Sequence, residues 1–343
     1  MNINNIVRKN ILSLKPYSSA RDEFTGVEGV FLDANENPFG ELNRYPDPYQ
    51  KELKEKLAAL KGTSAENVFI GNGSDEVIDL AIRIFCNPGE DKALTFSPTY
   101  GMYTISSAIN NVELIKVPLT REFQIDLNLT SDYLADSNLK MIFICSPNNP
   151  TGNLINENDI QYILNKFNGI VIIDEAYIEF SLSKSWLANI DKYPNLIVSQ
   201  TFSKAWGLAA ARVGVAYAGK EIIQLFNKVK PPYNVSGPNQ KAVINALLNP
   251  SEYEGNLLTI LDQKEKLEVA LNGMEIIKKV YPSDANFFLI EVIDANRIYN
   301  ELVNRQLITR NRNNSIDNCI RVSVGTPNEN ELLIASLREM KNE

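Results

Sequence analysis

A lysine flanked by hydroxyl side chains is the residue of this sequence whose chemistry is clearest. Lys204 follows Thr201 and Ser203. Arg212 comes eight residues after the lysine. A lysine amine can form a Schiff base with an aldehyde, and two hydroxyls with a guanidinium can bind a dianionic phosphate. Residues 201–212 therefore predict a strand-to-helix junction that binds pyridoxal phosphate, a cofactor that carries both groups.

A carboxylate and a phenol follow a predicted strand at residues 170–174. Asp174 ends this otherwise apolar strand, and Tyr177 comes three residues later. A carboxylate at such a buried position needs a partner, and the protonated pyridine nitrogen of the cofactor is a suitable one. A phenol beside the ring oxygen would tune the electronic properties of the cofactor. We therefore expect both side chains to bind the pyridine ring.

A glycine turn at residues 71–76 follows a short strand and opens a predicted helix. The first backbone N–H groups of a helix lack intrahelical partners, so Gly73, Ser74 and Asp75 could hold a phosphate there. A plain helix start also has a glycine turn followed by acidic residues. Without the lysine motif, this structural explanation would be favoured.

Two further motifs have both a ligand-binding and a structural interpretation. Residues 146–152 end a strand, and Asn149 could donate to the ring oxygen of the cofactor or belong to a plain Asn-Pro turn. Tyr100, within residues 98–103, could stack on the pyridine ring or pack in the core. Both interpretations stay open on the residues alone.

Composition limits the classes of function. The chain has 343 residues, is 44% hydrophobic and 22% charged, and has a formal net charge of -8. This is an ordinary globular composition that predicts no binding of nucleic acid or of an anionic membrane. The absence of histidine excludes Ser-His-Asp hydrolysis and the usual zinc sites, so we expect no metal. Proton transfer then falls to another group, and Lys204 is the candidate.

Cysteine content and the first residues indicate a cytoplasmic protein. Cys86, Cys145 and Cys319 are odd in number and scattered, which suits buried thiols in a reducing compartment. The start of the chain lacks the apolar core of a signal peptide, and no apolar run has membrane-spanning length.

Apolar segments alternate with amphipathic helical segments between residues 67 and 219. This pattern is typical of a mostly parallel sheet buried on both faces. The motifs above then lie at the carboxyl ends of strands, where ligands bind in such sheets. The candidate strands are residues 68–70, 93–96, 114–117, 140–145, 170–174, 196–199 and 213–216.

A second unit is predicted after the Pro231-Pro232 pair, which interrupts the alternation. Two long helical patterns follow, and then come two strand-like runs and a closing helix that begins at Pro327. The fold class is therefore α/β, with a seven-stranded sheet in a large domain and a small α+β domain. The expected divisions are an irregular N-terminal arm (1–35) that contributes to the small domain and the active site, a large cofactor-binding domain (36–240) and a small domain (241–343). The long helical patterns cover residues 238–248 and 251–271, and the strand-like runs cover 286–292 and 320–324.

Taken together, the motifs resemble the fold-type I, aspartate-aminotransferase-like enzymes that use pyridoxal phosphate. Finer segments look like the histidinol-phosphate aminotransferase family. These segments are residues 32–40, 43–47, 98–103 and 321–326. The resemblance covers almost the whole chain and implies an obligate homodimer with shared active sites.

The resemblance also implies roles for individual residues. The lysine that matches Lys204 carries the Schiff base, and those matching Asn149 and Tyr177 bind the ring oxygen. The tyrosine matching Tyr45 reaches the cofactor phosphate of the neighbouring subunit. Substrate binding is implied for Arg321, which holds the anionic end, and for Arg310, Tyr17 and Asn35. Arg312 is the alternative to Arg310, because the aspartate that usually lies between these positions in the family is Asn311 here.

The reaction implied is transfer of an amino group from L-histidinol phosphate to 2-oxoglutarate, in histidine biosynthesis. A threonine-phosphate decarboxylase and an aromatic aminotransferase are rivals with the same scaffold. A non-catalytic protein that binds the cofactor, or a plain α/β binding module, is a rival of another class. The intact set of Lys204, Asp174 and Tyr177 favours an enzyme.

Overall fold

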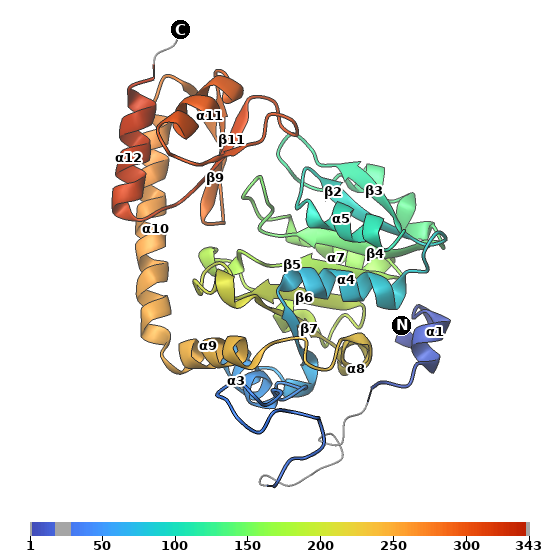
Figure 1. Cartoon of the computed structure of the whole chain (residues 1–343). Helices are drawn as coiled ribbons and strands as arrows, with labels where there is room; N and C mark the ends of the chain where they lie inside the picture. Colours follow the sequence, from blue (N-terminus) through green and yellow to red (C-terminus); the bar gives the residue numbers. More distant parts are fainter. Residues whose placement is uncertain (1, 18–28, 341–343) are drawn as a thin grey trace.

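The structure is a computed structural model that describes residues 2–17 and 29–340. Its centre is a seven-stranded sheet with the strand order β1-β7-β6-β5-β4-β2-β3 (Figure 1). Strand β7 is antiparallel to both of its neighbours, and the other pairs are parallel. The expectation of a mostly parallel seven-stranded sheet is confirmed. The strands are β1 (Val68–Asn72), β2 (Lys92–Ser97), β3 (Glu113–Pro118), β4 (Leu139–Cys145), β5 (Ile170–Asp174), β6 (Leu196–Thr201) and β7 (Val213–Ala218).

The alternation of side chains along the strands explains why helices cover both faces of this sheet. On β5, Val171 and Ile173 belong to one apolar core, whereas Ile170 and Ile172 belong to the other. Helices α3, α7 and α9 contribute to the first core, and α4, α5 and α8 contribute to the second. These helices are α3 (Lys51–Lys61), α4 (Ser74–Phe85), α5 (Met102–Ile109), α7 (Glu157–Lys166), α8 (Lys220–Val229) and α9 (Gly237–Leu248), with a short α6 (Leu127–Thr130).

Short 3-10 helices lie in the connections of this large unit. They are η2 (Ala65–Asn67), η3 (Tyr133–Ala135), η4 (Ile178–Phe180), η5 (Trp186–Asn189) and η6 (Ala209–Ala211). We expected a helix to follow β6 at Lys204, and this prediction is wrong. The connection from β6 to β7 contains only η6, a single 3-10 turn. The chain reverses direction there, and so β7 returns antiparallel beside β6.

Four strands from the C-terminal part of the chain form a second, antiparallel sheet with the order β10-β11-β9-β8. Helix α10 runs from the level of α9 to this sheet, where it packs beside α12 (Figure 1). The unit has its own apolar core. Its elements are α10 (Pro250–Asn272), β8 (Ile277–Val280), β9 (Phe287–Val292), α11 (Ala295–Asn304), β10 (Arg310–Asn311), β11 (Cys319–Ser323) and α12 (Pro327–Arg338). The expected helices and strands of this region are confirmed, while the domain boundaries at 35 and 240 stay a prediction.

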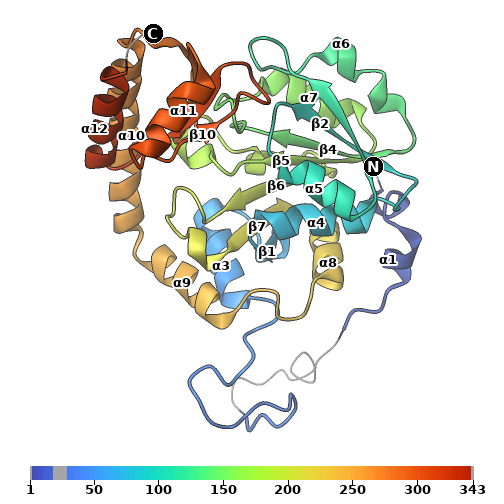
Figure 2. The ribbon, with the colours of Figure 1, turned by 45° about the horizontal axis from the view of Figure 1, so that its top comes forward.

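The first residues of the chain differ from the expected irregular arm. They form η1 (Ile3–Asn5) and α1 (Lys9–Ser13), and the Arg8 backbone N–H donates to the Ile84 carbonyl of α4 at 3.0 Å. Figure 2 shows α1 beside the large sheet, far from α11 and α12. The reason is a set of three apolar residues at intervals of four, one in η1, one between the two helices and one in α1. Its members, Ile3, Val7 and Ile11, are all buried in the second core of the large sheet.

The remainder of the expected arm is exposed where the structure describes it. Part of the predicted segment, residues 18–28, lies outside the described residues. Residues 29–50, which we call the arm from here on, extend away from the sheet (Figure 2), and four large apolar side chains among them are 79–89% exposed. These four are Val30, Leu32, Phe39 and Leu42. Within the described ranges, no helix has the length and apolar character needed to cross a membrane.

Candidate active site

A cavity of about 550 Å³ lies between the two sheets, at the carboxyl edge of the parallel strands. Most of the residues singled out in the sequence line it. Those from the large unit are Ser74, Asp75, Tyr100, Asn149, Asp174, Tyr177, Thr201, Ser203, Lys204 and Arg212, and those from the second sheet are Arg310, Arg312 and Arg321. The motifs meet because each follows a strand whose carboxyl end reaches this edge, or precedes the antiparallel β7.

The N-terminus of α4 and the segment after β6 bring together several hydrogen-bond donors, and we call this group the cradle. Ser74 begins α4, and Gly73 before it has a φ of 78°. A Cβ at Gly73 would lie 2.5 Å from Arg212 Nη2 and would displace the guanidinium, and the positive φ itself favours glycine at this position. The hydroxyl of Thr201 donates to Ser203 Oγ at 3.1 Å. Helix N–H groups, two hydroxyls and a guanidinium thus converge as a dianion requires.

A close approach between β7 and α4 places this cradle. Gly214 on β7 lies so near the backbone of Gly73 and Ser74 that a Cβ there would collide with them. Any larger residue at position 214 would push the helix N-terminus away from the sheet edge. The sequence-predicted phosphate site therefore depends on two glycines rather than one.

Asp75 connects two other members of the site. Its Oδ1 accepts a hydrogen bond from the Tyr100 hydroxyl at 3.1 Å, and its Oδ2 lies 3.3 Å from Arg212 Nη2. Burial and the Asp75 carboxylate raise the pKa of Tyr100, which therefore stays a neutral phenol. Asp75 thus orients a ring at the cavity wall and a cation in the cradle.

Asp174 is the buried carboxylate of the cavity, with only 3% of its surface exposed. Its Oδ2 accepts a hydrogen bond from the Tyr103 hydroxyl at 2.8 Å, and its Oδ1 accepts one from the Ala176 N–H at 3.2 Å. Desolvation raises the pKa of Asp174 to about 6, although these two hydrogen bonds oppose the shift. A cationic ring nitrogen beside this carboxylate would favour its ionised form.

Tyr103 is a site residue that the sequence reasoning missed. It is fully buried on α5, and its ring stacks on Phe143 of β4 with centroids 4.8 Å apart. A buried phenol must find a hydrogen-bond partner, and this one holds Asp174 in place. Tyr100 precedes α5, which begins at Met102, so the spacing of the two tyrosines in the sequence gave no signal for the role of Tyr103.

Asn149 and Tyr177 lie together, as expected of two residues that bind one ring oxygen. The Asn149 amide donates to the Tyr177 hydroxyl at 3.4 Å. Its oxygen accepts a hydrogen bond from Arg321 Nη1 at 2.5 Å. The Arg321 guanidinium also lies 5.1 Å above the ring of Phe287, a second residue that the sequence reasoning did not place in the site. Asn149 therefore joins the cofactor-binding wall to the arginines of the second sheet.

Lys204 lies between these groups and remains accessible. Its Nζ is 5.6 Å from the centroid of the Tyr177 ring. Desolvation, with help from Arg321, lowers the pKa of Lys204. A lowered pKa increases the neutral fraction of the amine, which is the nucleophilic and proton-accepting form.

Three arginines line the cavity on the side of the second sheet. Arg310 lies in β10, Arg321 lies in β11, and Arg312 directly follows β10. Arg310 and Arg321 face each other across the β10–β11 pair, and Arg312 lies two residues further along the chain. Desolvation, with Arg321 and Arg310 adding to it, lowers the pKa of Arg312 to about 10. The Nε atoms of Arg312 and Arg321 are buried and have no hydrogen-bond partner in the described part of the chain. Five cations and two carboxylates line this cavity, although the chain as a whole is acidic.

Three predicted site residues lie elsewhere in the chain's own fold. Tyr17 is 68% exposed. Asn35 and Tyr45 line a separate hollow of about 970 Å³ formed by the arm and the start of α9. Tyr45 stacks on Tyr233 with centroids 4.4 Å apart and remains half exposed. Their predicted roles in binding stay predictions.

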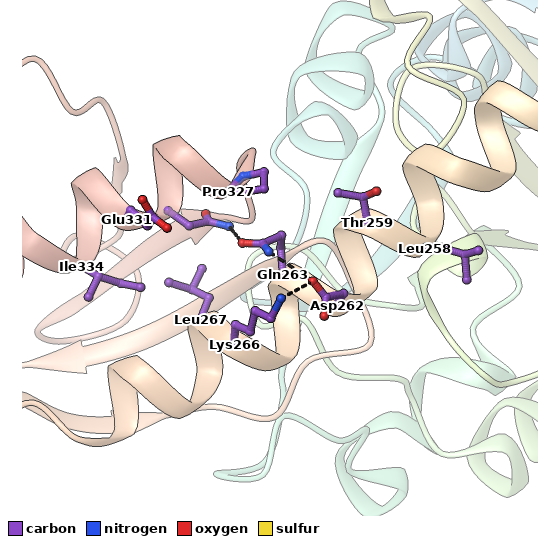
Figure 3. A pocket seen from close by; sticks show the side chains of 10 residues that line it. Leu258, Thr259, Asp262, Gln263, Lys266, Leu267, Pro327, Glu331 and Ile334 are labelled. Carbon is purple, nitrogen blue, oxygen red and sulfur yellow. Dashed lines mark hydrogen bonds and ion pairs between the residues drawn. The ribbon is translucent and has the colours of Figure 1, made fainter.

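Another hollow, of about 710 Å³, lies between α10 and α12 (Figure 3). Its buried amides already bond within the chain: Asn330 donates to Gln263 Oε1 at 3.2 Å, and Gln263 donates to Asp262 Oδ2 at 3.2 Å. The lysine that lines it, Lys266, is exposed and pairs with Asp262 at 2.7 Å, and no arginine is among the described residues that line it. We therefore assign the chemistry to the cavity between the sheets.

An accessible lysine, a group of donors suited to a phosphate and a buried carboxylate at the edge of this sheet define a pyridoxal-phosphate-dependent enzyme of the aminotransferase type. The residues present fit the cofactor, because the cavity provides donors for its phosphate, an acceptor for its ring nitrogen and an amine for its aldehyde.

Comparison with known proteins gives the family. The sequence model described as aminotransferase class I and II matches residues 21–337. The chain belongs to this family and, within it, to the histidinol-phosphate aminotransferases. It is 49% identical to the histidinol-phosphate aminotransferase of Cytophaga hutchinsonii over 98% of each chain, and 49% identical to that of Christiangramia forsetii over 100% of this chain and 99% of the relative. The crystal structure of the histidinol-phosphate aminotransferase from Clostridium acetobutylicum superposes with a TM-score of 0.80 at 26% identity, covering 87% of this chain and 90% of that one.

Proposed function

We propose that this protein transfers an amino group from L-histidinol phosphate to 2-oxoglutarate, giving imidazole-acetol phosphate and L-glutamate, in the histidine biosynthesis of the cytoplasm. The observation that carries the proposal is the group of Arg310, Arg312 and Arg321 in the cavity of Lys204 and Asp174. Each substrate has an anionic group distant from its reacting carbon, and a guanidinium can bind a phosphate or a carboxylate through two hydrogen bonds. The names of the relatives support the same pair of substrates.

Each wall of the cavity would then have its own task. Pyridoxal phosphate, when bound, stores the amino group between the two substrates. Ser74, Thr201, Ser203 and Arg212 would hold its phosphate, as their convergence indicates. Asp174 would keep the ring nitrogen protonated.

Lys204 would move the proton of the reaction. Its Nζ would accept the proton from the substrate carbon that bears the amino group, because its lowered pKa makes the neutral amine available. Tyr177 and Asn149 would hold the ring oxygen, and Arg321 would hold the anionic end of the substrate. The hydrogen bond from Arg321 to Asn149 would then exchange for one to the substrate anion.

The arm supports a homodimer with shared sites. Residues 29–50 expose Val30, Leu32, Phe39 and Leu42, and a surface of this apolar character is usually covered by a partner. Tyr45 lies on the same segment, outside the cavity of its own chain. We therefore propose that Tyr45 completes the site of a second copy.

The substrate assignment is tested by offering amines to the holoenzyme one at a time. L-glutamate and L-histidinol phosphate should each remove the absorbance of the aldehyde form of the cofactor, and no CO₂ should be released. CO₂ release from L-threonine phosphate would instead identify a decarboxylase. Faster reaction with tyrosine or phenylalanine than with histidinol phosphate would identify an aromatic aminotransferase. If none of these amines removes the absorbance, the protein binds the cofactor without catalysing amino transfer.

The shared site is tested by mixing two inactive variants. In a hybrid of Lys204→Ala and Tyr45→Ala subunits, one of the two sites carries neither change, so mixing should restore part of the activity. The control is Tyr133→Ala, a change at an exposed tyrosine outside the arm, which should stay active by itself. Failure to complement after verified subunit exchange would contradict the shared site.

A further inference from the structure

The loop that carries Lys204 makes a close aromatic contact with helix α10. The indole of Trp206 stacks on the Tyr253 ring, with centroids 3.9 Å apart and an interplanar angle of 9°. Trp206 is two residues after Lys204, and Tyr253 lies in the first turn of α10. Of the ring pairs described, this one has the shortest centroid distance.

Backbone hydrogen bonds and burial also hold this loop, and one of these bonds, from the Leu208 N–H to the Phe202 carbonyl at 2.9 Å, closes it around the lysine. The Gly207 N–H donates to the Lys204 carbonyl at 3.0 Å, and Gly207 has a φ of 68°, so the chain turns tightly just after the lysine. Ala205, between the lysine and the tryptophan, is buried against the Tyr177 and Phe287 cluster. The direction of Lys204 therefore depends on how the loop is held at Ala205 and Trp206.

Trp206 is also held on the large-domain side. Its ring packs against Phe202 with centroids 5.4 Å apart. Burial raises the pKa of the nearby Glu179 carboxyl, while Lys61 at 3.5 Å and the Trp206 indole act in the opposite direction. The indole thus lies between the partly buried ion pair of Lys61, on α3, with Glu179 and the first turn of α10.

Helix α10 belongs to the second unit at its other end. Leu267 and Leu271, near its C-terminus, are fully buried in the core of the four-stranded sheet that carries Arg321. A helix is stiff over this length, so a movement of the second sheet would move Tyr253 as well. The stack is therefore a physical link between the arginine-bearing unit and the lysine loop.

We propose that Tyr253 is a positioning residue, which acts through Trp206 to set the direction of Lys204 and to couple it to the position of the second sheet. This inference rests on the proposed function of Lys204. A stacked aromatic pair contributes enough that its loss should change a rate by roughly three- to tenfold. The effect should fall on kcat, because substrate binding is assigned to other residues.

The test uses three variants of α10 in the holoenzyme. Tyr253→Ala removes the stack, Tyr253→Phe keeps it, and Leu258→Ala changes an exposed side chain of the same helix that borders the hollow of Figure 3. Tyr253→Ala should lower kcat roughly three- to tenfold at nearly constant KM. It should also move the pH midpoint of the bound cofactor's absorbance by about half a unit, which is a threefold change in proton affinity. Tyr253→Phe and Leu258→Ala should behave as the wild type.

A merely structural role would give another result. If Tyr253→Ala keeps the wild-type kcat and pH midpoint while Lys204→Ala is inactive, the stack is packing only and the role of Lys204 stands. If Lys204→Ala is active, both the proposed function and the positioning role are wrong. Tyr253→Leu retains apolar volume and replaces Tyr253→Ala should that variant fail to fold. Its kcat and midpoint should then change in the same way, and wild-type values would overturn the proposal.

Discussion

The wall of the cavity built by the seven-stranded sheet and the wall built by the four-stranded sheet satisfy their polar groups differently. On the first wall, both oxygens of Asp174 accept hydrogen bonds, and Asp75 holds Tyr100 and Arg212. On the second wall, the described residues offer no partner to the buried Nε atoms of Arg312 and Arg321. The first wall thus suits a ligand that remains bound, such as the cofactor. The second suits substrate anions that bind and leave in each turnover.

The largest effect should come from the first wall. Lys204→Ala should lower the rate of amino transfer by about 10⁴-fold or more, because the lysine amine that lines the cavity is lost. The rate of the half-reaction with L-glutamate measures this, with cofactor content checked by absorbance. Lys184→Ala, at an exposed lysine, should have the wild-type rate. Substantial turnover by Lys204→Ala would remove the lysine from its role.

The second wall should affect both substrates at once. Arg321→Ala should lower kcat/KM for histidinol phosphate and for glutamate by roughly two to three orders of magnitude, because a charge-assisted pair in a desolvated pocket is lost. Arg321→Lys should recover little, because an ammonium cannot form the same two parallel hydrogen bonds. Stopped-flow measurement of each half-reaction decides the matter. If only the half-reaction with glutamate is impaired, then Arg310 or Arg312 holds the phosphate of histidinol phosphate.

A change in the cradle should weaken cofactor binding without weakening substrate binding by Arg310, Arg312 and Arg321. Arg212→Ala should weaken cofactor binding by roughly 10- to 100-fold, since one charge-assisted contact to a phosphate is removed. With saturating cofactor, KM for histidinol phosphate should stay close to the wild-type value. Titration of the apoenzyme with pyridoxal phosphate gives the affinity, and steady-state kinetics gives KM. A large rise in KM with unchanged cofactor affinity would place Arg212 on the other wall.

The smallest effect concerns the stability of the apoenzyme. A carboxyl pKa raised from 3.8 to about 6 means that folding favours protonated Asp174, so its contribution is present below pH 4 and is lost as the pH rises through 6. That loss amounts to roughly 3 kcal/mol. Asp174→Asn apoenzyme should therefore melt a few °C above the wild type at pH 8 and show little difference at pH 4. Calorimetry across this range tests it, and a constant difference would contradict it.

The difference in Tm between Asp174→Asn and the wild type should reverse when the cofactor is present. In the holoenzyme, the pyridinium partner compensates the Asp174 charge, whereas an asparagine amide cannot hold the ring proton. Added cofactor should therefore raise the Tm of the wild type more than that of Asp174→Asn at pH 8. An equal rise in both proteins would show that the partner of the ring nitrogen lies elsewhere.

Most residues of the first wall could be predicted from the sequence because their motifs are local. Lys204, Asp174 and Asn149 each follow an apolar strand, and the rule that parallel strands end at one edge brings them together. Tyr103 was missed because its partner is 71 residues away and nothing near it in the sequence marks a buried hydroxyl. The stack of Trp206 on Tyr253 is non-local in the same way.

The N-terminal helix was missed for another reason. Ile3, Val7 and Ile11 have helical spacing, but the helices η1 and α1 have only three and five residues and little intrinsic stability. Their structure comes from burial against the large sheet, which a local pattern cannot reveal. The irregular arm was therefore placed too early in the chain.

Hydrogen bonds within the described part of the arm hold it in a defined conformation. The Glu36 carboxylate accepts hydrogen bonds from Arg44 Nη1 and from the Tyr45 N–H, each at 2.7 Å, and α3 begins at Lys51. Subunits that meet through a preformed segment need not fold it during the encounter. Assembly of the proposed dimer should therefore show an ordinary second-order association rate, on the order of 10⁵ to 10⁷ M⁻¹s⁻¹, with no slow unimolecular phase after collision.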